Sequence, residues 1–184
     1  MARALAPPAA RGVSRVEYER MADLGFFQGE HVELVRGTVV RMAPIGPAHA
    51  SAVQRLAELL LPRLLGRATV RIQQPFLAFD DSEPEPDVAI VPPGRYADRH
   101  PDRAMCVIEV AESSLAYDLE TKAPLYAASG VEQYWVVDVA GGVAHAHARP
   151  EGDRYAVVRQ VVAGQALGIA AFPDVVVEVA GIVG

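Results

Sequence analysis

The 184-residue chain is poor in the residues and motifs on which several classes of protein depend. Its single cysteine, Cys106, excludes an internal disulfide and a cysteine-based zinc cluster, and this usage favours the cytoplasm. No apolar run approaches the ~20 residues of a membrane-spanning helix. Residues 1–11 lack the apolar block of a secretory signal. Glycine-rich phosphate loops, His-x-x-x-His pairs and Gly-x-Ser-x-Gly motifs do not occur either, which argues against the enzyme classes built on them.

Positive charge is scarce, and lysine is nearly absent. The net charge of −6 argues against indiscriminate binding to nucleic acid, although it leaves room for a local basic patch. Of the 17 cationic residues, only Lys122 is a lysine. A lysine ammonium is a compact point charge whose pKa can shift, whereas the arginine guanidinium is a planar fork with a permanent charge. Lys122 is therefore a candidate for chemistry that arginine performs poorly.

Hydrophobic periodicity and turn residues predict an α/β protein with a mixed sheet, as one domain over residues 13–184 after a disordered tail at 1–12. The expected helices cover residues 15–24, 48–64 and 118–129. A hairpin is expected at 31–42, and further strands at 69–79, 87–91, 105–111, 131–139, 143–148, 155–162 and 175–179. The central order is thus one helix, three strands, one helix and one strand, with a helix and hairpin before it and antiparallel strands after it.

Asp87 opens a short apolar strand directly after Pro86. If residues 82–87 are extended, Glu83, Glu85 and Asp87 face the same side. The alternative is a solvated acidic loop. That alternative suits Glu83 and Glu85 better than Asp87, because four apolar residues follow Asp87 at once.

Glu109 is the only acidic or basic residue in the apolar run 105–111, which reads as a central strand covered on both faces. A buried carboxylate needs partners, because desolvating an unpaired one costs several kcal/mol or more. An arginine partner or a position at a water-exposed strand end would satisfy Glu109. A bound cation would do so as well, and this makes Glu109 a candidate metal ligand.

Lys122 lies on the helix that follows this strand. Asp118, Lys122 and Tyr126 are spaced i, i+4 and i+8 and form one stripe of the helix. An exposed Asp118–Lys122 ion pair, worth ~0.3–0.5 kcal/mol, is the alternative to a functional role for Lys122. Pro124 fits only if the helix begins near residues 119–121, which places the proline in the first turn.

Two acidic groups on adjacent strands can hold Mg²⁺, and a nearby lysine can orient the attacking water or stabilise charge on a phosphate. The combination resembles the PD-(D/E)XK nuclease superfamily, with Pro86-Asp87 as the first motif and Glu109 as the second acidic position. The lysine expected two residues after Glu109 is replaced by Ala111. In some branches of the superfamily this lysine has moved to the following helix, where Lys122 lies.

The chain is similar in more detail to the Uma-type restriction endonuclease family. Matching segments follow in the family's order at residues 33–42 (ELVRGTVVRM), 46–49 (GPAH), 84–88 (PEPDV), 107–111 (VIEVA) and 118–138. This resemblance implies an αβββαβ nuclease-like core with an acidic, metal-binding centre. It also implies that Glu33 is a further metal ligand, and that His49 caps the long helix or supports the metal ligands. Glu85 and Tyr126 are further candidates for supporting the metal ligands or contacting substrate, although packing in the core is the alternative for Tyr126.

These observations together predict a Mg²⁺- or Mn²⁺-dependent DNA endonuclease. Asp87 and Glu109, with Glu33, would bind the metal, and Lys122 would position water or stabilise the transition state. By analogy with type II-like nucleases, the resemblance implies a homodimer. The acidic pI and Ala111 favour an alternative, a nuclease-fold protein that binds nucleic acid or a protein partner without cutting. A metal phosphoesterase acting on small substrates is a third possibility.

Overall fold

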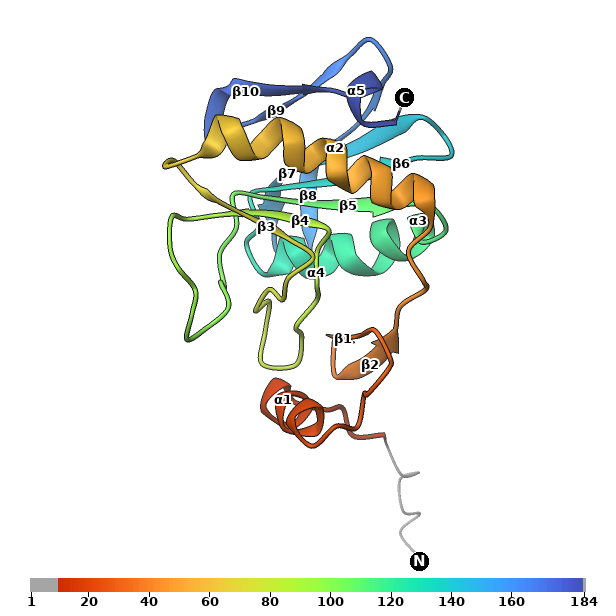
Figure 1. Ribbon diagram of the computed structural model, residues 1–184, viewed down its shortest axis with the longest axis vertical. Coiled ribbons are helices and arrows are strands. Elements are labelled where there is room, and N and C mark those ends of the chain that lie inside the picture. Colours follow the sequence, from red (N-terminus) through yellow and green to blue (C-terminus); the bar gives the residue numbers. More distant parts are fainter. Residues whose placement is uncertain (1–9, 184) are drawn as a thin grey trace, which may run out of the picture.

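The computed structural model describes residues 10–183, so most of the tail expected at residues 1–12 lies outside the described part of the chain. Among the described residues, no helix combines the length and apolar character needed to cross a membrane. The chain forms a central six-stranded sheet, helices on both faces of that sheet, and a small N-terminal unit beside it (Figure 1).

The six-stranded sheet is mixed, as the sequence predicts, and has the order β3-β4-β5-β6-β7-β8. Its strands are β3 (Thr69–Ile72), β4 (Val88–Val91), β5 (Cys106–Ala111), β6 (Gln133–Asp138), β7 (Val143–Glu151) and β8 (Arg154–Val162). β5 and β6 pair in parallel, and the other neighbours are antiparallel. A parallel pair needs a crossover connection, which the helical segment between β5 and β6 supplies.

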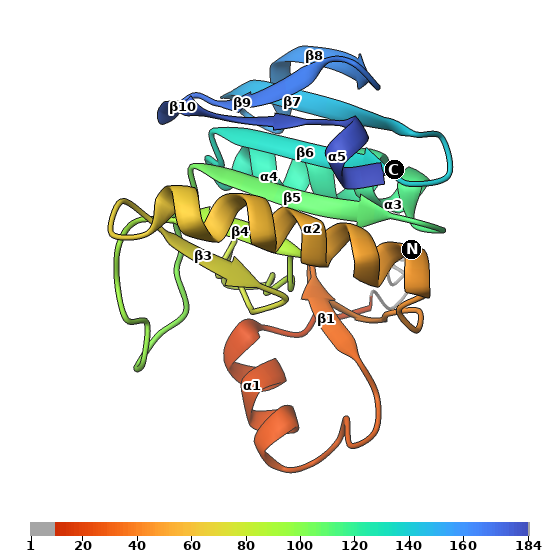
Figure 2. The same cartoon turned by 45° about the horizontal axis from the view of Figure 1, so that its top comes forward.

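Helices pack on both faces of β5, which explains why this strand is almost entirely apolar. Helix α2 (Pro47–Leu64) shares one hydrophobic core with Cys106, Ile108 and Val110 (Figure 2). The segment made of α3 (Leu115–Tyr117), η1 (Asp118–Lys122) and α4 (Ala123–Ala128) lies on the other face. There α4 packs with Val107 and Ala111. Because side chains alternate along a strand, Glu109 faces this second helical segment.

The helical segment after β5 differs from the prediction in its start and in its geometry. It begins at Leu115 rather than near residues 119–121, and residues 118–122 form a π-helical turn in which the Ala123 N–H donates to the Asp118 carbonyl. Pro124 follows in the first turn of α4. Proline has no N–H and its ring clashes with the carbonyl four residues earlier, so the wider turn accommodates it inside a continuous helical segment.

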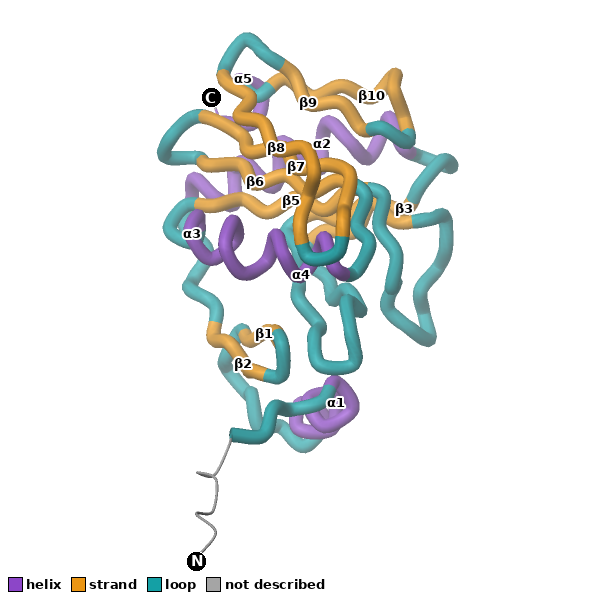
Figure 3. Tube along the Cα trace, turned by 180° about the vertical axis from the view of Figure 1, so that it is seen from behind, coloured by secondary structure: helices purple, strands orange, loops and turns teal. Residues whose placement is uncertain are grey.

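The N-terminal unit consists of α1 (Arg15–Asp23) and the hairpin of β1 (Val32–Val35) and β2 (Thr38–Arg41). The predicted capping box between Ser14 and Glu17 is present. The unit lies to one side of the sheet (Figure 3). It is joined to the loop before β4 by two backbone hydrogen bonds between Leu34 and Glu83, which bring β1 toward the start of β4.

The C-terminal residues form a separate hairpin, β9 (Ala166–Ile169) and β10 (Phe172–Glu178), followed by α5 (Ala180–Val183). Their apolar side chains join the core beneath α2. The sequence prediction missed β9 and extended the strand at 69–79 too far. That strand ends at Ile72 because Gln73 takes a positive φ of 48° and Pro75 follows soon after.

Candidate active site

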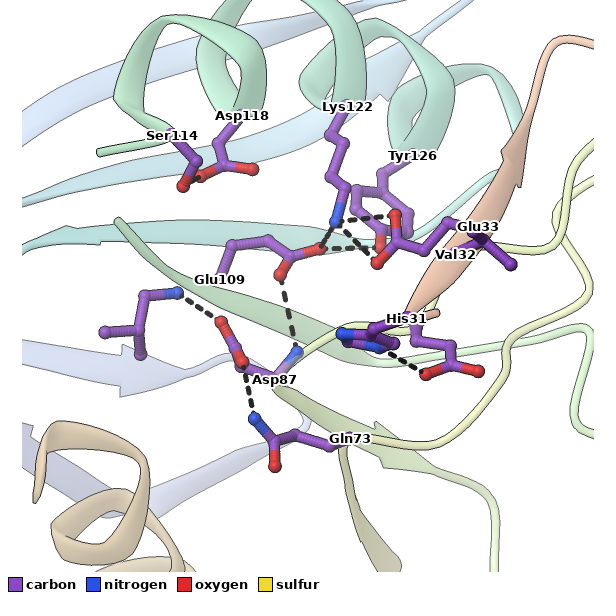
Figure 4. A network of polar contacts seen from close by, with 12 residues as sticks. His31, Val32, Glu33, Gln73, Asp87, Glu109, Ser114, Asp118, Lys122 and Tyr126 are labelled. Atoms are coloured by element: carbon purple, nitrogen blue, oxygen red, sulfur yellow. Dashed lines mark hydrogen bonds and ion pairs between the residues drawn. The ribbon is translucent and has the colours of Figure 1, made fainter. Parts of the chain in front are cut away.

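A cavity of about 450 Å³, including its open mouth, lies where the N-terminal hairpin meets β4, β5 and η1. Most of the polar residues predicted for a site line it (Figure 4). The lining residues are His31, Glu33, Met42, Ala43, Ile45, His49, Gln73, Glu85, Asp87, Glu109, Val110, Ser114, Asp118 and Lys122. The cavity therefore collects side chains from segments that are far apart in the sequence.

Asp87 immediately precedes β4 and Glu109 lies in the neighbouring antiparallel strand β5, and their side chains enter the same cavity. The Val110 N–H donates to Asp87 Oδ2 at 2.8 Å, and the Asp87 N–H donates to Glu109 Oε2 at 3.4 Å. Each carboxylate thus accepts a hydrogen bond from the backbone of the neighbouring segment. These contacts hold the two acidic groups side by side at the junction of β4 and β5.

Lys122 reaches into the cavity from the π-helical turn and contacts two carboxylates. Its Nζ lies 3.0 Å from Glu109 Oε1, and 3.1 and 3.0 Å from the two oxygens of Glu33. Lys122 and Glu33 are each only 1% exposed. The predicted alternative of an exposed Asp118–Lys122 pair is therefore wrong. Asp118 is buried and accepts a hydrogen bond from the Ser114 hydroxyl at 2.6 Å.

The charges in the cavity perturb one another strongly because little water reaches them. Burial opposes the charge on Lys122, but Glu109 and Glu33 outweigh this effect and raise its pKa, so the ammonium persists at neutral pH. Burial raises the pKa of Glu109, Lys122 opposes that rise, and the nearby carboxylates add to it. Burial also raises the pKa of Asp118, to about 6. In the lining of the cavity, acidic side chains outnumber Lys122 and the two histidines.

The donor atoms in the cavity suit a divalent cation. Mg²⁺ takes oxygen ligands and usually only one or two carboxylates, which Asp87 and Glu109 can supply. Glu33 Oε2 is buried and makes no hydrogen bond, although it lies close to the Lys122 amine. Within residues 10–183, no three acidic or histidine side chains already stand in the arrangement of a complete metal site. A metal bound here would be held by carboxylates of the cavity, and solvent would complete its coordination.

Two further side chains hold Asp87 in place. His49, in the first turn of α2, contacts Asp87 Oδ1 through Nε2 at 2.8 Å, and this hydrogen bond raises the pKa of His49. The Gln73 amide donates to the same oxygen at 3.3 Å. His49 thus lies where the family resemblance implies a supporting residue. Gln73 was not predicted, because its place between Ile72 and Gln74 in the sequence gives no sign of its contacts in the fold.

Tyr126 and Glu85, the other expected supporting residues, occupy different parts of the site. The buried Tyr126 hydroxyl donates to Glu109 Oε1 at 2.9 Å, so this oxygen accepts hydrogen bonds from both Lys122 and Tyr126. Glu85 lies nearer the rim, where its Oε2 is 2.9 Å from Nε2 of His31. His31 and Ser114 were not singled out from the sequence, since single histidines and serines are common on protein surfaces.

Comparison with known proteins identifies the family. The family model Uma2, described as a putative restriction endonuclease, matches residues 15–180. The chain belongs to the Uma2 family. No curated protein shows a significant match to its sequence. Membership of the Uma2 family supports a nuclease-like role and confirms the resemblance seen in the sequence segments.

A solved structure confirms the fold. The chain is similar to the crystal structure of a putative nuclease belonging to DUF820 from Anabaena variabilis ATCC 29413, with a TM-score of 0.75 and 12% sequence identity. The match covers 93% of this chain and 97% of the other. At that identity the likeness concerns the fold, which is the nuclease-like architecture expected for a Uma2 protein.

Proposed function

We propose that this Uma2 protein is a metal-dependent endonuclease that hydrolyses phosphodiester bonds of DNA with Mg²⁺ or Mn²⁺. The observation that carries the proposal is the convergence of Asp87, Glu109 and Lys122 in one cavity. Two carboxylates on adjacent strands beside a buried ammonium match the needs of phosphodiester hydrolysis, which requires a metal, an oriented water and stabilisation of negative charge.

In this proposal Asp87 and Glu109 hold the metal, with Glu33 as a further ligand. A bound divalent cation supplies Lewis acidity and lowers the pKa of a coordinated water. Lys122 stays protonated at neutral pH, so it acts as a fixed positive charge toward the phosphate or the attacking water rather than as a base. His49 and Tyr126 keep the two metal-binding carboxylates oriented through their hydrogen bonds.

The test is cleavage of plasmid and oligonucleotide DNA with Mg²⁺ or Mn²⁺. Glu109→Gln and Lys122→Met should each lower the cleavage rate ~10²–10³-fold. Glu120→Gln is the matched control, because this exposed glutamate lies on the same helical segment outside the cavity lining and its variant should cut like the wild type. Circular dichroism verifies that every variant is folded.

Two outcomes contradict the proposal. Cleavage that survives in Glu109→Gln and Lys122→Met would remove both residues from the mechanism. Wild-type protein that binds DNA in Ca²⁺ but never cuts it in Mg²⁺ or Mn²⁺ would support the non-cleaving alternative. A salt titration of that binding would then report its electrostatic share.

The proposal includes a homodimer, because cutting both strands of a duplex in one encounter needs two such sites. Sedimentation velocity with and without DNA measures the oligomeric state, and a monomer under both conditions contradicts this part of the proposal.

A further inference from the structure

Gln73 has an unusual backbone conformation for a residue at the mouth of the cavity. It follows the last residue of β3, lies opposite Asp87, and has a φ of 48°. Residues other than glycine seldom occupy this left-handed region, and glutamine has none of the local hydrogen bonding that helps asparagine there. Such conformations are concentrated at binding and catalytic sites, where the surrounding structure holds them in place.

Gln73 contacts Asp87 through both its backbone and its side chain. The Gln73 N–H donates to the Asp87 carbonyl at 3.1 Å, and the side-chain amide donates to Asp87 Oδ1 at 3.3 Å. The side chain is otherwise exposed and lines the cavity (Figure 4). The contact with Asp87 is therefore the specific polar contact of this side chain.

The donors around Asp87 limit the directions in which its carboxylate can bind anything else. An ionised carboxylate has about four lone-pair sites. His49 and Gln73 donate to Oδ1, and the Val110 N–H donates to Oδ2. These three donors leave about one site, on Oδ2, beside Glu109. Without Gln73, Oδ1 would keep only the His49 donor, and the carboxylate could turn further about its last torsion angle between the His49 and Val110 contacts.

We propose that Gln73 is a positioning residue of this site, which fixes the Asp87 carboxylate so that its remaining lone pair points at a divalent cation. The inference rests on the proposed metal-dependent function. Partners of this kind, which orient a metal ligand without touching the metal, typically change metal affinity or activity 10–100-fold when removed.

The chain offers a close control in the neighbouring Gln74, which is exposed and lies outside the cavity lining. Gln73→Met keeps the length of the side chain and removes its donor, and Gln74→Met makes the same change one residue away. The first measurement is the Mn²⁺ concentration that gives half of the metal-induced rise in melting temperature. Gln73→Met should raise it at least tenfold, and Gln74→Met should leave it unchanged.

The second measurement separates positioning from general damage. Gln73→Met should lower kcat for DNA cleavage at limiting Mn²⁺, with KM for DNA within twofold of wild type and partial recovery at high Mn²⁺. If Gln73 only supported the local fold, Gln73→Met would instead lower the melting temperature of the metal-free protein, and added Mn²⁺ would not restore cleavage.

The third measurement does not depend on activity or on metal. The ¹³Cγ resonance of Asp87, assigned with Asp87→Asn, should move in Gln73→Met and stay in place in Gln74→Met. An unmoved resonance in Gln73→Met overturns the proposal. If Mn²⁺ does not raise the melting temperature of the wild type and the wild type does not cut DNA, the proposed function fails. A moved resonance in Gln73→Met would still support the role of Gln73 in orienting the Asp87 carboxylate.

Discussion

Lys122 carries its charge where almost no water reaches it, and two carboxylates from different parts of the chain share it. Such groups stabilise the folded state only as a set, because each pays a desolvation cost that its partners offset. Removing one member leaves the others charged, buried and unpaired. The single lysine is thus structural as well as a candidate for catalysis.

Lys122→Met should therefore lower the free energy of unfolding by about 3–5 kcal/mol, since Glu33 and Glu109 lose their counter-charge. Adding Glu33→Gln should restore part of the loss, because one of the two unpaired carboxylates becomes neutral. Urea denaturation of the wild type, both single variants and the double variant measures the coupling. Strictly additive losses would contradict a shared charge network.

Glu83 provides a test outside the cavity. Burial is the main cause that raises the pKa of Glu83 from 4.5 to about 7, and the charge of the nearby Glu19 adds to it. Oε2 of Glu83 makes no hydrogen bond. The folded protein keeps a proton on Glu83 that the unfolded chain has already released, so this group makes stability fall as pH rises from about 4.5 to 7. Glu83→Gln should remove that fall and add on the order of 1–2 kcal/mol at pH 8, after allowance for solvent screening.

Urea denaturation at pH 5 and pH 8 checks the Glu83 prediction. The exposed Glu58 provides the control, because Glu58→Gln should leave the difference between the two pH values as it is in the wild type. A Glu83→Gln variant with the wild-type pH dependence would show that Glu83 is ionised throughout.

For single residues, the sequence was enough to predict the charged members of the candidate site, but not the uncharged ones. Glu109 and Asp87 stand out because a carboxylate within or beside an apolar strand is costly, and Lys122 stands out because it has no equivalent elsewhere in the chain. Gln73 could not be predicted in the same way. Amide side chains are ordinary in loops, and the sequence does not indicate that Gln73 adopts a positive φ.

At the scale of elements, the predicted order was right wherever periodicity was strong, as in α2 and β5. The π-helical turn of η1 was not predicted, because an extra residue in one turn leaves the local pattern of apolar residues nearly unchanged. That turn directs Lys122 toward β5 and the hairpin. The missed strand β9 has four residues and, among the described residues, pairs with β10 alone, so its own sequence carries little signal.

The β1–β2 hairpin brings Glu33 to the cavity, and its turn depends on Gly37. Gly37 has a φ of 72°, and an added Cβ would lie 3.0 Å from the backbone of Gly12. Gly37→Ala should therefore cost about 1–3 kcal/mol and loosen the hairpin, because it adds both strain and a close contact. Hydrogen exchange of the amides in β1 and β2 measures the loosening.

Gly66→Ala is the control for the hairpin variant. Gly66 has a similar φ of 74°, but an added Cβ there meets nothing within 4 Å, and it lies beyond the far end of α2. This variant should lose less stability and leave exchange in the hairpin at the wild-type rate. Equal effects in both variants would mean that the contact with Gly12 does not matter.

At the scale of the whole molecule, the acidic groups and Lys122 of the site come from three separate segments: the N-terminal hairpin, the β4–β5 junction and the helical turn η1. Any ligand that bridges them should stabilise the folded chain by mass action. Mg²⁺ or Mn²⁺ should therefore raise the melting temperature, in proportion to the logarithm of metal concentration above the dissociation constant. Glu109→Gln should abolish the shift, and an equal shift in wild type and Glu109→Gln would exclude Glu109 as a ligand.

The single buried lysine also gives the molecule one built-in chemical reporter. An amine-acylating reagent modifies lysine only as the free base in contact with solvent, so on the native protein the adduct at Lys122 should form only during moments when the hairpin separates from β5. The rate of acylation at Lys122, followed by mass spectrometry of the peptide that contains it, therefore measures how often the cavity opens. Metal should slow the labelling, Gly37→Ala should hasten it, and the ratio to the rate in urea gives the fraction of time the site stands open.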